Sequence, residues 1–468
     1  MDAGNQRNDK FDKMTTMPVK KLVLSLAGPS ITIMMITSLY NLAATYWVSF
    51  LGTSEVAAVG IAYPLMAIIQ AFGFFFGQGS GNYISRALGA RDSENASRMA
   101  ATALISGFIC MAFIALMGII NLGRFVEMLG TTETIKPHAM EYIFFILLAS
   151  PWMVAATVLN QQLRFQGSAA IAMVGMLSGA ILNIIMDPVF IFVLGLGVRG
   201  AAMAAMFCQM LSFFILLFYG TTRKGNIRIN FSHFSPSISR YIEMFRGGVP
   251  SMIRQGLMSV ATIVINHFAK PYGDAAIAAI SIASRINMFA NSMALGFGQG
   301  FQPVCGFNYG AKLYSRVKKA FWFCVRTCCF SLFVISLVLM FFAPQIIAFF
   351  RKDDPDVIRI GAFGLRMYCI SLPLMAGATM VNMITQTMGK ALEASAIAFS
   401  RQGLLLIPLL FILTPFMGLL GIQLAIPLAD IASLFIVIPI LIKTMKIISV
   451  PDGSGKAEAI PVVIPTEE

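Results

Sequence analysis

Apolar residues follow one another in long runs along most of the chain, and short polar or basic stretches separate the runs. Each run has about twenty residues or more, which is long enough for a helix to cross about 30 Å of hydrocarbon. Six runs lie near residues 22–51, 56–84, 97–121, 140–163, 169–196 and 200–220, and six more lie near residues 247–269, 276–307, 320–349, 361–388, 394–415 and 417–442. The pattern predicts an all-α integral membrane protein with twelve transmembrane helices.

The second six runs repeat the first six. Residues 28–90 align with residues 249–311 without a gap, so that Pro29 falls on Pro250. Such repeats are typical of transporters with two similar halves around the substrate, and we expect two pseudo-symmetric six-helix lobes. Proline inside a membrane helix marks a kink, which makes Pro29 the predicted hinge of the first helix.

The runs also predict the domain boundaries. The first run is too long for the apolar core of a cleaved signal peptide, so it is expected to remain as a helix. We expect a cytoplasmic N-terminal tail over residues 1–21, a first lobe over 22–220, a cytoplasmic linker over 221–246, a second lobe over 247–448 and a disordered cytoplasmic tail over 449–468.

Composition and charge agree with a membrane location. Charged residues make up 12% of the chain, against about 25% in soluble domains, and the mean hydropathy is +0.79. Most of the 34 Lys and Arg lie in the two tails and in the loops on the same side as the tails. This asymmetry predicts a multi-pass protein of the cell (inner) membrane with both termini in the cytoplasm. The net charge of +13 then reflects topology and contact with lipid headgroups, not nucleic-acid binding.

No catalytic or metal-binding pattern is visible. The seven cysteines lie in or beside apolar runs and have no metal-ligand spacing with the three histidines. The glycines of residues 77–81 lack the preceding strand of a phosphate-binding loop and are expected to pack helices closely. We expect no enzyme activity, no metal site and no cofactor other than a coupling ion.

Charges inside the predicted spans are the sharpest signal, because each one is costly in a membrane and is commonly functional. Only Asp187 and Asp430 lie well inside spans among the acids. Arg164 is assigned to a loop, so the five arginines in spans all belong to the second half: Arg254, Arg285, Arg326, Arg366 and Arg401. Asp187 therefore lacks a buried arginine in its own half, which favours a proton or cation site.

Two neighbours strengthen the interpretation of Asp187. Asn183 lies four residues earlier, on the same helix face, and Pro188 follows and loosens the local backbone. The alternative is that Asp187 only caps or hydrogen-bonds a neighbouring helix.

Specific segments resemble one transporter family. The stretch from Leu182 to Phe190, followed by residues 197–202, is similar to the fifth-to-sixth helix signature of the multidrug and toxic compound extrusion (MATE) family. Further resemblance lies around Pro29 and in residues 50–60, 86–90, 248–250 and 282–285, and the similarity covers about residues 20–445.

The resemblance implies two six-helix lobes around a central cavity and secondary active export of amphiphilic, often cationic drugs and dyes by alternating access, in exchange for H⁺ or Na⁺. It implies a coupling-cation site at Tyr142, Asn183 and Asp187. Two positions depart from the family pattern: Ala44 stands where a carboxylate is expected, and Ala205 stands where a hydroxyl is expected. A site with fewer ligands favours H⁺ over Na⁺.

The substrate cavity is less well marked. A chain with 31 Met and 11% aromatic residues can line an adaptable apolar cavity. The polar residues expected nearest the cavity are Arg254, Gln255, Arg401, Gln402 and Asp430. The arginines either bind an anionic group or pair with helix carbonyls. An alternative function is therefore a flippase or exporter of an anionic, lipid-linked or amphiphilic substrate. We expect a monomer in the lipid bilayer.

Overall fold

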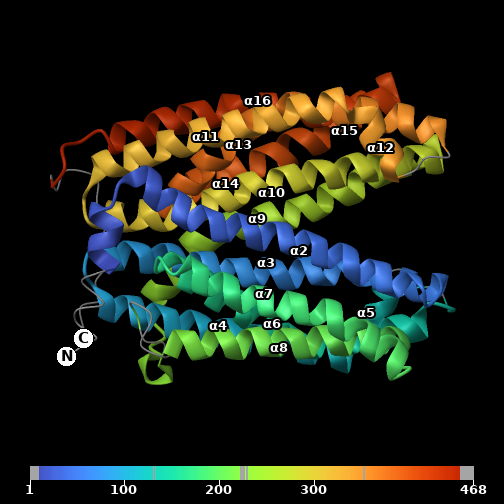
Figure 1. The fold of residues 1–468 in the computed structure, drawn as a ribbon, viewed down its shortest axis with the longest axis horizontal. Helices are drawn as coiled ribbons and strands as arrows, with labels where there is room; N and C mark the ends of the chain where they lie inside the picture. Colours follow the sequence, from blue (N-terminus) through green and yellow to red (C-terminus); the bar gives the residue numbers. More distant parts are fainter. Residues whose placement is uncertain are drawn as a thin grey trace. The chain divides into compact units, whose positions relative to one another are not determined.

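The computed structural model describes residues 10–129, 131, 133–221, 227, 230–350 and 354–453. These residues form helices joined by short turns, and no strand occurs among them (Figure 1). The helices of the first half are α2 (Val19–Ser49), α3 (Thr53–Gly89), α4 (Ser93–Ile120), α5 (Leu122–Met128), α6 (Lys136–Phe165), α7 (Ala169–Pro188), η1 (Val189–Val193), α8 (Gly197–Thr221) and η2 (Phe231–His233). Those of the second half are α9 (Ile238–Ala269), η3 (Lys270–Tyr272), α10 (Asp274–Gly310), α11 (Tyr314–Phe341), α12 (Ala343–Phe350), α13 (Pro355–Thr387), α14 (Ala391–Phe399), η4 (Ser400–Leu406), α15 (Ile407–Met417) and α16 (Leu419–Ile447).

Most of the predicted spans appear as single long helices. Among the described residues, 11 helical segments are long and apolar enough to cross a membrane, and α10 is a further helix of 37 residues. The span over residues 169–193 joins α7 to η1, and the span over 391–417 joins α14, η4 and α15. A π-type segment therefore interrupts one span in each half of the chain.

The described residues divide into two compact units, and each unit contains the beginning of a helix from the other half of the sequence. Unit 1 holds residues 10–17 and 32–252, and unit 2 holds residues 18–31 and 253–453. Helix α2 thus starts in unit 2 and continues in unit 1, whereas α9 starts in unit 1 and continues in unit 2. Helix α2 passes from unit 2 to unit 1 after residue 31, and α9 passes from unit 1 to unit 2 after residue 252. Pro29 and Pro250 each lie two residues before these points.

One enclosed helix forms the centre of each unit. Helix α6 packs against α3, α4 and α8, and α13 packs against α10, α11 and α16. The repeated glycines make this packing close: Gly77 lies against Gln161 of α6, and Gly298 lies against Met383 of α13. Side chains larger than hydrogen would collide there, so the predicted packing role of the glycines is confirmed.

Turns at corresponding places in the two halves have the same backbone geometry. Gly167 and Gly389 have φ angles of +79° and +80°, which only glycine adopts without strain. The non-glycine residues Arg91 and Lys312 also share a positive φ, at +62° and +59°. The internal repeat therefore extends from sequence to the conformation of single residues.

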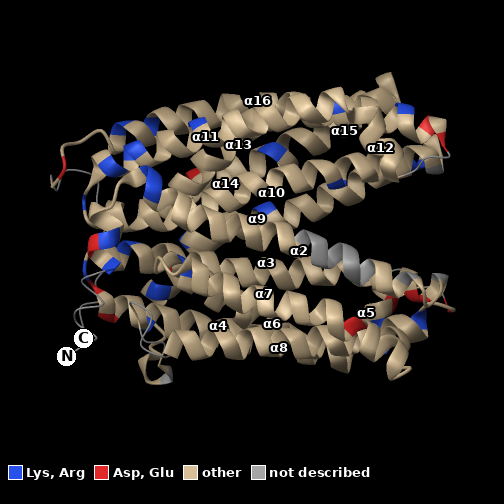
Figure 2. Ribbon diagram, in the orientation of Figure 1, with Lys and Arg blue, Asp and Glu red and all other residues tan. Residues whose placement is uncertain are grey.

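Within each unit, Lys and Arg gather mainly towards one end of the helices (Figure 2). Helix α9 begins at Ile238, inside the stretch 221–246 that was expected to be a linker, of which residues 222–226, 228 and 229 lie outside the described residues. Residues 454–468 of the expected C-terminal tail also lie outside them. The described start of that tail lies against α11, where Asp452 accepts hydrogen bonds from the Ser315 backbone N–H at 2.9 Å and from its Oγ at 2.5 Å.

Candidate functional site

Asp187 and Asn183 continue a row of small residues on the face of α7 that meets α8. Gly175 lies against Leu216 and Gly179 lies against Ser212 of α8, and Asn183 and Asp187 follow at intervals of four residues. The backbones are close because the glycines lack side chains. Asn183 and Asp187 are each only 3% exposed, so the carboxylate is held inside unit 1, as the sequence predicted.

Among the described residues, polar side chains surround Asp187 but no Lys or Arg pairs with it. Its charge acts on the Tyr142 hydroxyl of α6 and on the Cys208 thiol of α8, and Asn183 lies within reach of both Asp187 and Cys208. Neither Oδ1 nor Nδ2 of Asn183 forms a well-formed hydrogen bond, although both are buried. The structure thus brings together the three residues predicted for the cation site, and it leaves amide hydrogen-bonding capacity unused beside the carboxylate.

The backbone after Asp187 departs from an α-helix. Pro188 has no N–H to donate, and the chain continues as the π-type segment η1. Its end is held by hydrogen bonds from Leu194 N to Val189 O at 2.9 Å and from Leu196 N to Phe190 O at 3.2 Å. Single π-turns within α-helices are frequent at functional sites, and the disturbance expected from Pro188 is confirmed.

The two departures from the family pattern bear on the ligand count. Ala205 is half-buried in α8 and offers only a methyl group. The side chain of Ala44 lies outside the described residues. Within those residues, no group of three or more His, Cys, Asp or Glu could hold a metal ion. The site as described offers one carboxylate, one amide and one phenol.

The second buried carboxylate, Asp430 of α16, has a different environment. Its Oδ1 lies 2.5 Å from Nε of Arg401 in an ion pair, and its Oδ2 accepts a hydrogen bond from Ser371 Oγ at 2.7 Å. Arg401 therefore pairs with a carboxylate of the chain itself, which is neither of the two roles considered for the arginines, an anionic ligand or helix carbonyls. Asp430 and Arg401 neutralise each other inside unit 2.

The remaining arginines in the spans differ in their contacts. Arg366 donates to the backbone oxygen of Met340 at 3.2 Å, one of the two roles considered for these residues. Arg285 and Arg326 are exposed on their helices. Arg254 Nη1 donates to Asn382 Oδ1 at 3.5 Å, and no carboxylate in the described part of the chain forms an ion pair with it.

The glutamines next to Arg254 and Arg401 lie on different elements of unit 2. Gln255 is half-buried beside Arg254 on α9. Gln402 lies next to Arg401 in η4, and its buried Oε1 has no hydrogen-bond partner. The predicted substrate residues thus form two groups, one at α9 and one at η4 and α16.

The assignment of Arg164 to a loop is wrong. This residue belongs to α6, is 1% exposed and donates to Gln161 Oε1, and its guanidinium lies over the Phe165 ring. The first half therefore does contain a buried arginine. It lies near the C-terminal end of α6, whereas Tyr142, the neighbour of Asp187, lies near the N-terminal end, so it does not neutralise the carboxylate.

An ionic cluster in unit 1 was not predicted. Glu243 of α9 is 6% exposed; its Oε2 pairs with Arg86 Nη2 of α3 at 2.7 Å and its Oε1 with Arg246 Nη1 at 3.0 Å. The Arg86 pair joins the start of α9 to α3, whereas the Arg246 pair lies within α9. In the sequence, Glu243 lies three residues from Arg240 and three residues from Arg246. This charged stretch was interpreted as a polar linker.

Comparisons with known proteins agree with this arrangement. The MatE family model matches residues 29–189 and 250–412. The multidrug export protein MepA of Staphylococcus haemolyticus (strain JCSC1435) is 26% identical over 417 residues, which covers 89% of this chain and 92% of that protein. Among solved structures, MATE in the straight conformation (27% identity, TM-score 0.87) and in the bent conformation (28% identity, TM-score 0.85) each cover 93% of this chain and 98% of their own.

The matched MATE structures have twelve helices in two lobes, so the predicted architecture is confirmed. The resemblance found in the sequence motifs is confirmed as well, because the matched segments cover more than half of the chain.

Proposed function

The chain belongs to the MatE family of membrane transporters, which are not enzymes, and we propose that it is an exporter. Its substrates are amphiphilic, often cationic compounds, and it moves them by secondary active transport. The similarity to MepA, a multidrug export protein, supports this substrate range. A large supply of Met and aromatic side chains in the spans suits a cavity that accepts compounds of different shape.

The coupling ion binds at Asp187, with Asn183 and Tyr142 as neighbours. The observation that carries this step is the contrast between the two buried carboxylates: Asp430 is paired with Arg401, whereas no Lys or Arg of the described residues pairs with Asp187. A buried carboxylate without a cation is stabilised by taking up a proton or a metal cation. H⁺ needs fewer ligands than Na⁺, and Ala205 supplies none, so H⁺ is the favoured ion.

Alternating access involves bending of α2 at Pro29. The proline removes a helix hydrogen bond two residues before α2 passes from one compact unit to the other. Related MATE structures include a straight and a bent conformation. The protein lies in the cell (inner) membrane with both termini in the cytoplasm, as the distribution of Lys and Arg favours, and acts as a monomer.

Purified protein in sealed liposomes tests the proposal. An imposed pH gradient should drive ethidium transport, and a Na⁺ gradient of equal size without a pH difference should not. Asp187→Asn should remove the response to the pH gradient. Transport driven only by Na⁺ would overturn the choice of ion, and undiminished transport by Asp187→Asn would overturn the site.

A second candidate function, export of anionic or lipid-linked amphiphiles, is favoured by Arg254. Its guanidinium contacts the Asn382 amide and forms no ion pair in the described residues, and a carboxylate or phosphate is its preferred partner. Arg254→Gln should weaken binding of an anionic amphiphile about tenfold and leave ethidium binding unchanged, with the exposed Arg285→Gln as control. Equal losses for both ligands would exclude this function.

A further inference from the structure

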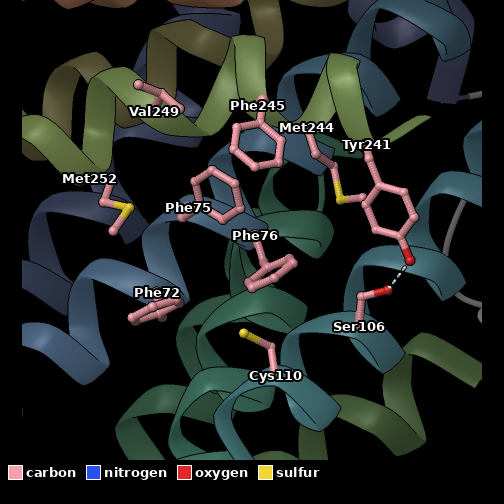
Figure 3. A pocket seen from close by; sticks show the side chains of 10 residues that line it. All are labelled: Phe72, Phe75, Phe76, Ser106, Cys110, Tyr241, Met244, Phe245, Val249 and Met252. Atoms are coloured by element: carbon pink, nitrogen blue, oxygen red, sulfur yellow. Dashed lines mark hydrogen bonds between the residues drawn. The ribbon is translucent and has the colours of Figure 1, made fainter. Parts of the chain in front are cut away.

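A cavity of about 390 Å³ lies within unit 1, between α3, α4 and the first part of α9. Figure 3 shows its lining, in which rings and thioethers predominate. Helix α3 supplies Phe72, Phe75 and Phe76, and α4 supplies Ser106 and Cys110. Helix α9 supplies Tyr241, Met244, Phe245, Val249 and Met252. The volume is that of a pocket for one drug-sized molecule.

Close packing on one side gives this cavity a fixed wall. Gly248 of α9 lies against the Phe75 backbone, and Gly79 of α3 lies against the Met244 backbone. The Arg86–Glu243 ion pair joins the same two helices. The rings of Phe75 and Phe76 meet edge to face at 5.0 Å, as do those of Phe75 and Phe245. The aromatic lining is therefore held in a defined arrangement before a ligand enters.

Polar chemistry is confined to one place in the pocket. Ser106 Oγ and Tyr241 OH form a hydrogen bond of 2.9 Å across the wall, seen as the dashed line in Figure 3. No Asp, Glu, Lys or Arg is among the described residues that line the cavity. A localised charge would lose its hydration without gaining a partner, whereas a delocalised cation is attracted to ring faces.

We propose that this pocket is a binding site for flat aromatic compounds that are neutral or carry a delocalised positive charge, with one hydrogen-bonding group directed to the Ser106–Tyr241 pair. The site is separate from Asp187 on α7. It rests on the proposed export function only in the choice of ligand class.

A saturated lipid chain is a weaker occupant. Lipid tails are as apolar as aliphatic side chains, so an acyl chain gains little when it leaves the bilayer for this cavity. An aromatic ligand gains additional ring–ring and sulfur–ring contacts. The lining therefore favours aromatic ligands over lipid chains, because apolar character alone gives a molecule no preference for the cavity over the bilayer.

The site also touches the helix that passes between the two units. Val249 and Met252 line the cavity and flank Pro250 of α9. A bound compound would contact α9 on both sides of this proline, which links occupancy of the pocket to the conformation of α9.

Protection of Cys110 tests the proposal on the purified, full-length protein. Cys110 and Cys329 are the two half-buried thiols, and the other five cysteines are buried. Saturating ethidium should slow alkylation of Cys110 by N-ethylmaleimide about tenfold and leave Cys329 unchanged, as followed by peptide mass spectrometry. Palmitate should protect Cys110 far less than ethidium.

Variants separate the aromatic contribution from simple filling of space. Phe72→Leu keeps an apolar side chain but removes a half-buried ring, and it should weaken ethidium protection about three- to tenfold. Phe113→Leu, on the exposed face of α4 outside the pocket, should have no effect.

Three results would overturn the site: no protection of Cys110 by ethidium, equal protection by palmitate, or unchanged affinity in Phe72→Leu. The protection measurement uses the protein without substitutions, so it tests ethidium binding in the pocket even if a variant folds poorly. It also requires no transport: absent export with intact protection would refute the proposed function and leave this site standing.

Discussion

At the scale of single residues, the two buried carboxylates differ in what neutralises them. Asp430 has Arg401 and Ser371, so its charge is satisfied within the fold. Asp187 has an amide, a phenol and a thiol as neighbours and no cation in the described residues. A charge that is already paired stabilises structure, whereas an unpaired one is available to a mobile ion.

We expect Asp187→Asn to abolish active ethidium transport and to leave the melting temperature of the purified protein unchanged. Asparagine keeps the size and hydrogen bonding of aspartate but cannot exchange a proton. Transport under an imposed pH gradient and thermal unfolding in detergent measure the two effects. A fall in melting temperature with loss of protein would instead indicate that Asp187 only hydrogen-bonds a neighbouring helix.

For the Arg401–Asp430 ion pair in unit 2, we expect substitution to lower the stability of the protein. Arg401→Gln leaves the Asp430 carboxylate buried without its partner and should cost about 1–3 kcal/mol of stability, less than for a fully enclosed pair because Arg401 is partly exposed. The double variant Arg401→Gln/Asp430→Asn should recover most of the loss in a double-mutant cycle. Additive losses would show that the two side chains are not coupled.

At the scale of the helices, the sequence predicted the spans well because each one is a long apolar run. It failed where charges lie inside the fold. Glu243 resembled part of a solvated linker because Arg86, its partner in the fold, comes from a distant part of the chain. Arg164 resembled a loop residue because it lies at the end of an apolar run, whereas α6 continues to Phe165. Asp187 and Asn183 were predictable from their spacing of four residues, whereas the aromatic pocket depends on α9 lying against α3 and α4.

Helix α2 should depend on Pro29 for movement. Pro29→Ala restores the missing helix hydrogen bond at the place where α2 passes between compact units, and it should lower the transport rate about tenfold while ethidium affinity stays constant. Pro64→Ala serves as the matched control, since Pro64 lies in α3, a helix that remains in one unit. Equal effects of the two substitutions would argue against a specific hinge.

The N-cap residue of α11, Leu313, forms no capping hydrogen bond with its side chain. Asp452 instead accepts a hydrogen bond from the backbone N–H of Ser315 in the first turn. Hydrogen bonds from Ser315 hold the pKa of the Asp452 carboxyl below its usual range. Their contribution is present above the ordinary aspartate pKa and is lost as pH falls through the lowered value. Asp452→Ala should speed amide exchange at residues 314–318 about threefold at pH 7, and the two proteins should become alike once the pH has fallen below the lowered pKa of the Asp452 carboxyl. A difference that persists in acid would exclude the carboxylate as its cause.

At the scale of the whole molecule, duplication produced similar backbones with dissimilar charges. Asn160 and Asn382 make the same hydrogen bond in their units, to Ala172 O and Ala394 O. Four residues after these asparagines the correspondence ends, because Gln386 stands where the first half has the buried Arg164. Glu243, similarly, corresponds to the buried Leu22. A shared framework therefore carries Asp187, which no Lys or Arg of the described residues neutralises, in unit 1 and the Asp430–Arg401 ion pair in unit 2.

This asymmetry leads to a prediction for the intact cell. If Asp187 couples export to the proton gradient, as proposed, expression in a bacterial strain that lacks its own efflux pumps should lower ethidium accumulation several-fold and raise tolerance to cationic drugs. The effect should vanish when an uncoupler collapses the proton gradient and should persist when external Na⁺ is replaced by K⁺.

Asp187→Asn, present in the membrane at the same level, is the matched control for passive effects of expression. Unchanged accumulation across a panel of cationic dyes, with the protein shown to be in the membrane, would contradict multidrug export and turn attention to anionic substrates at Arg254.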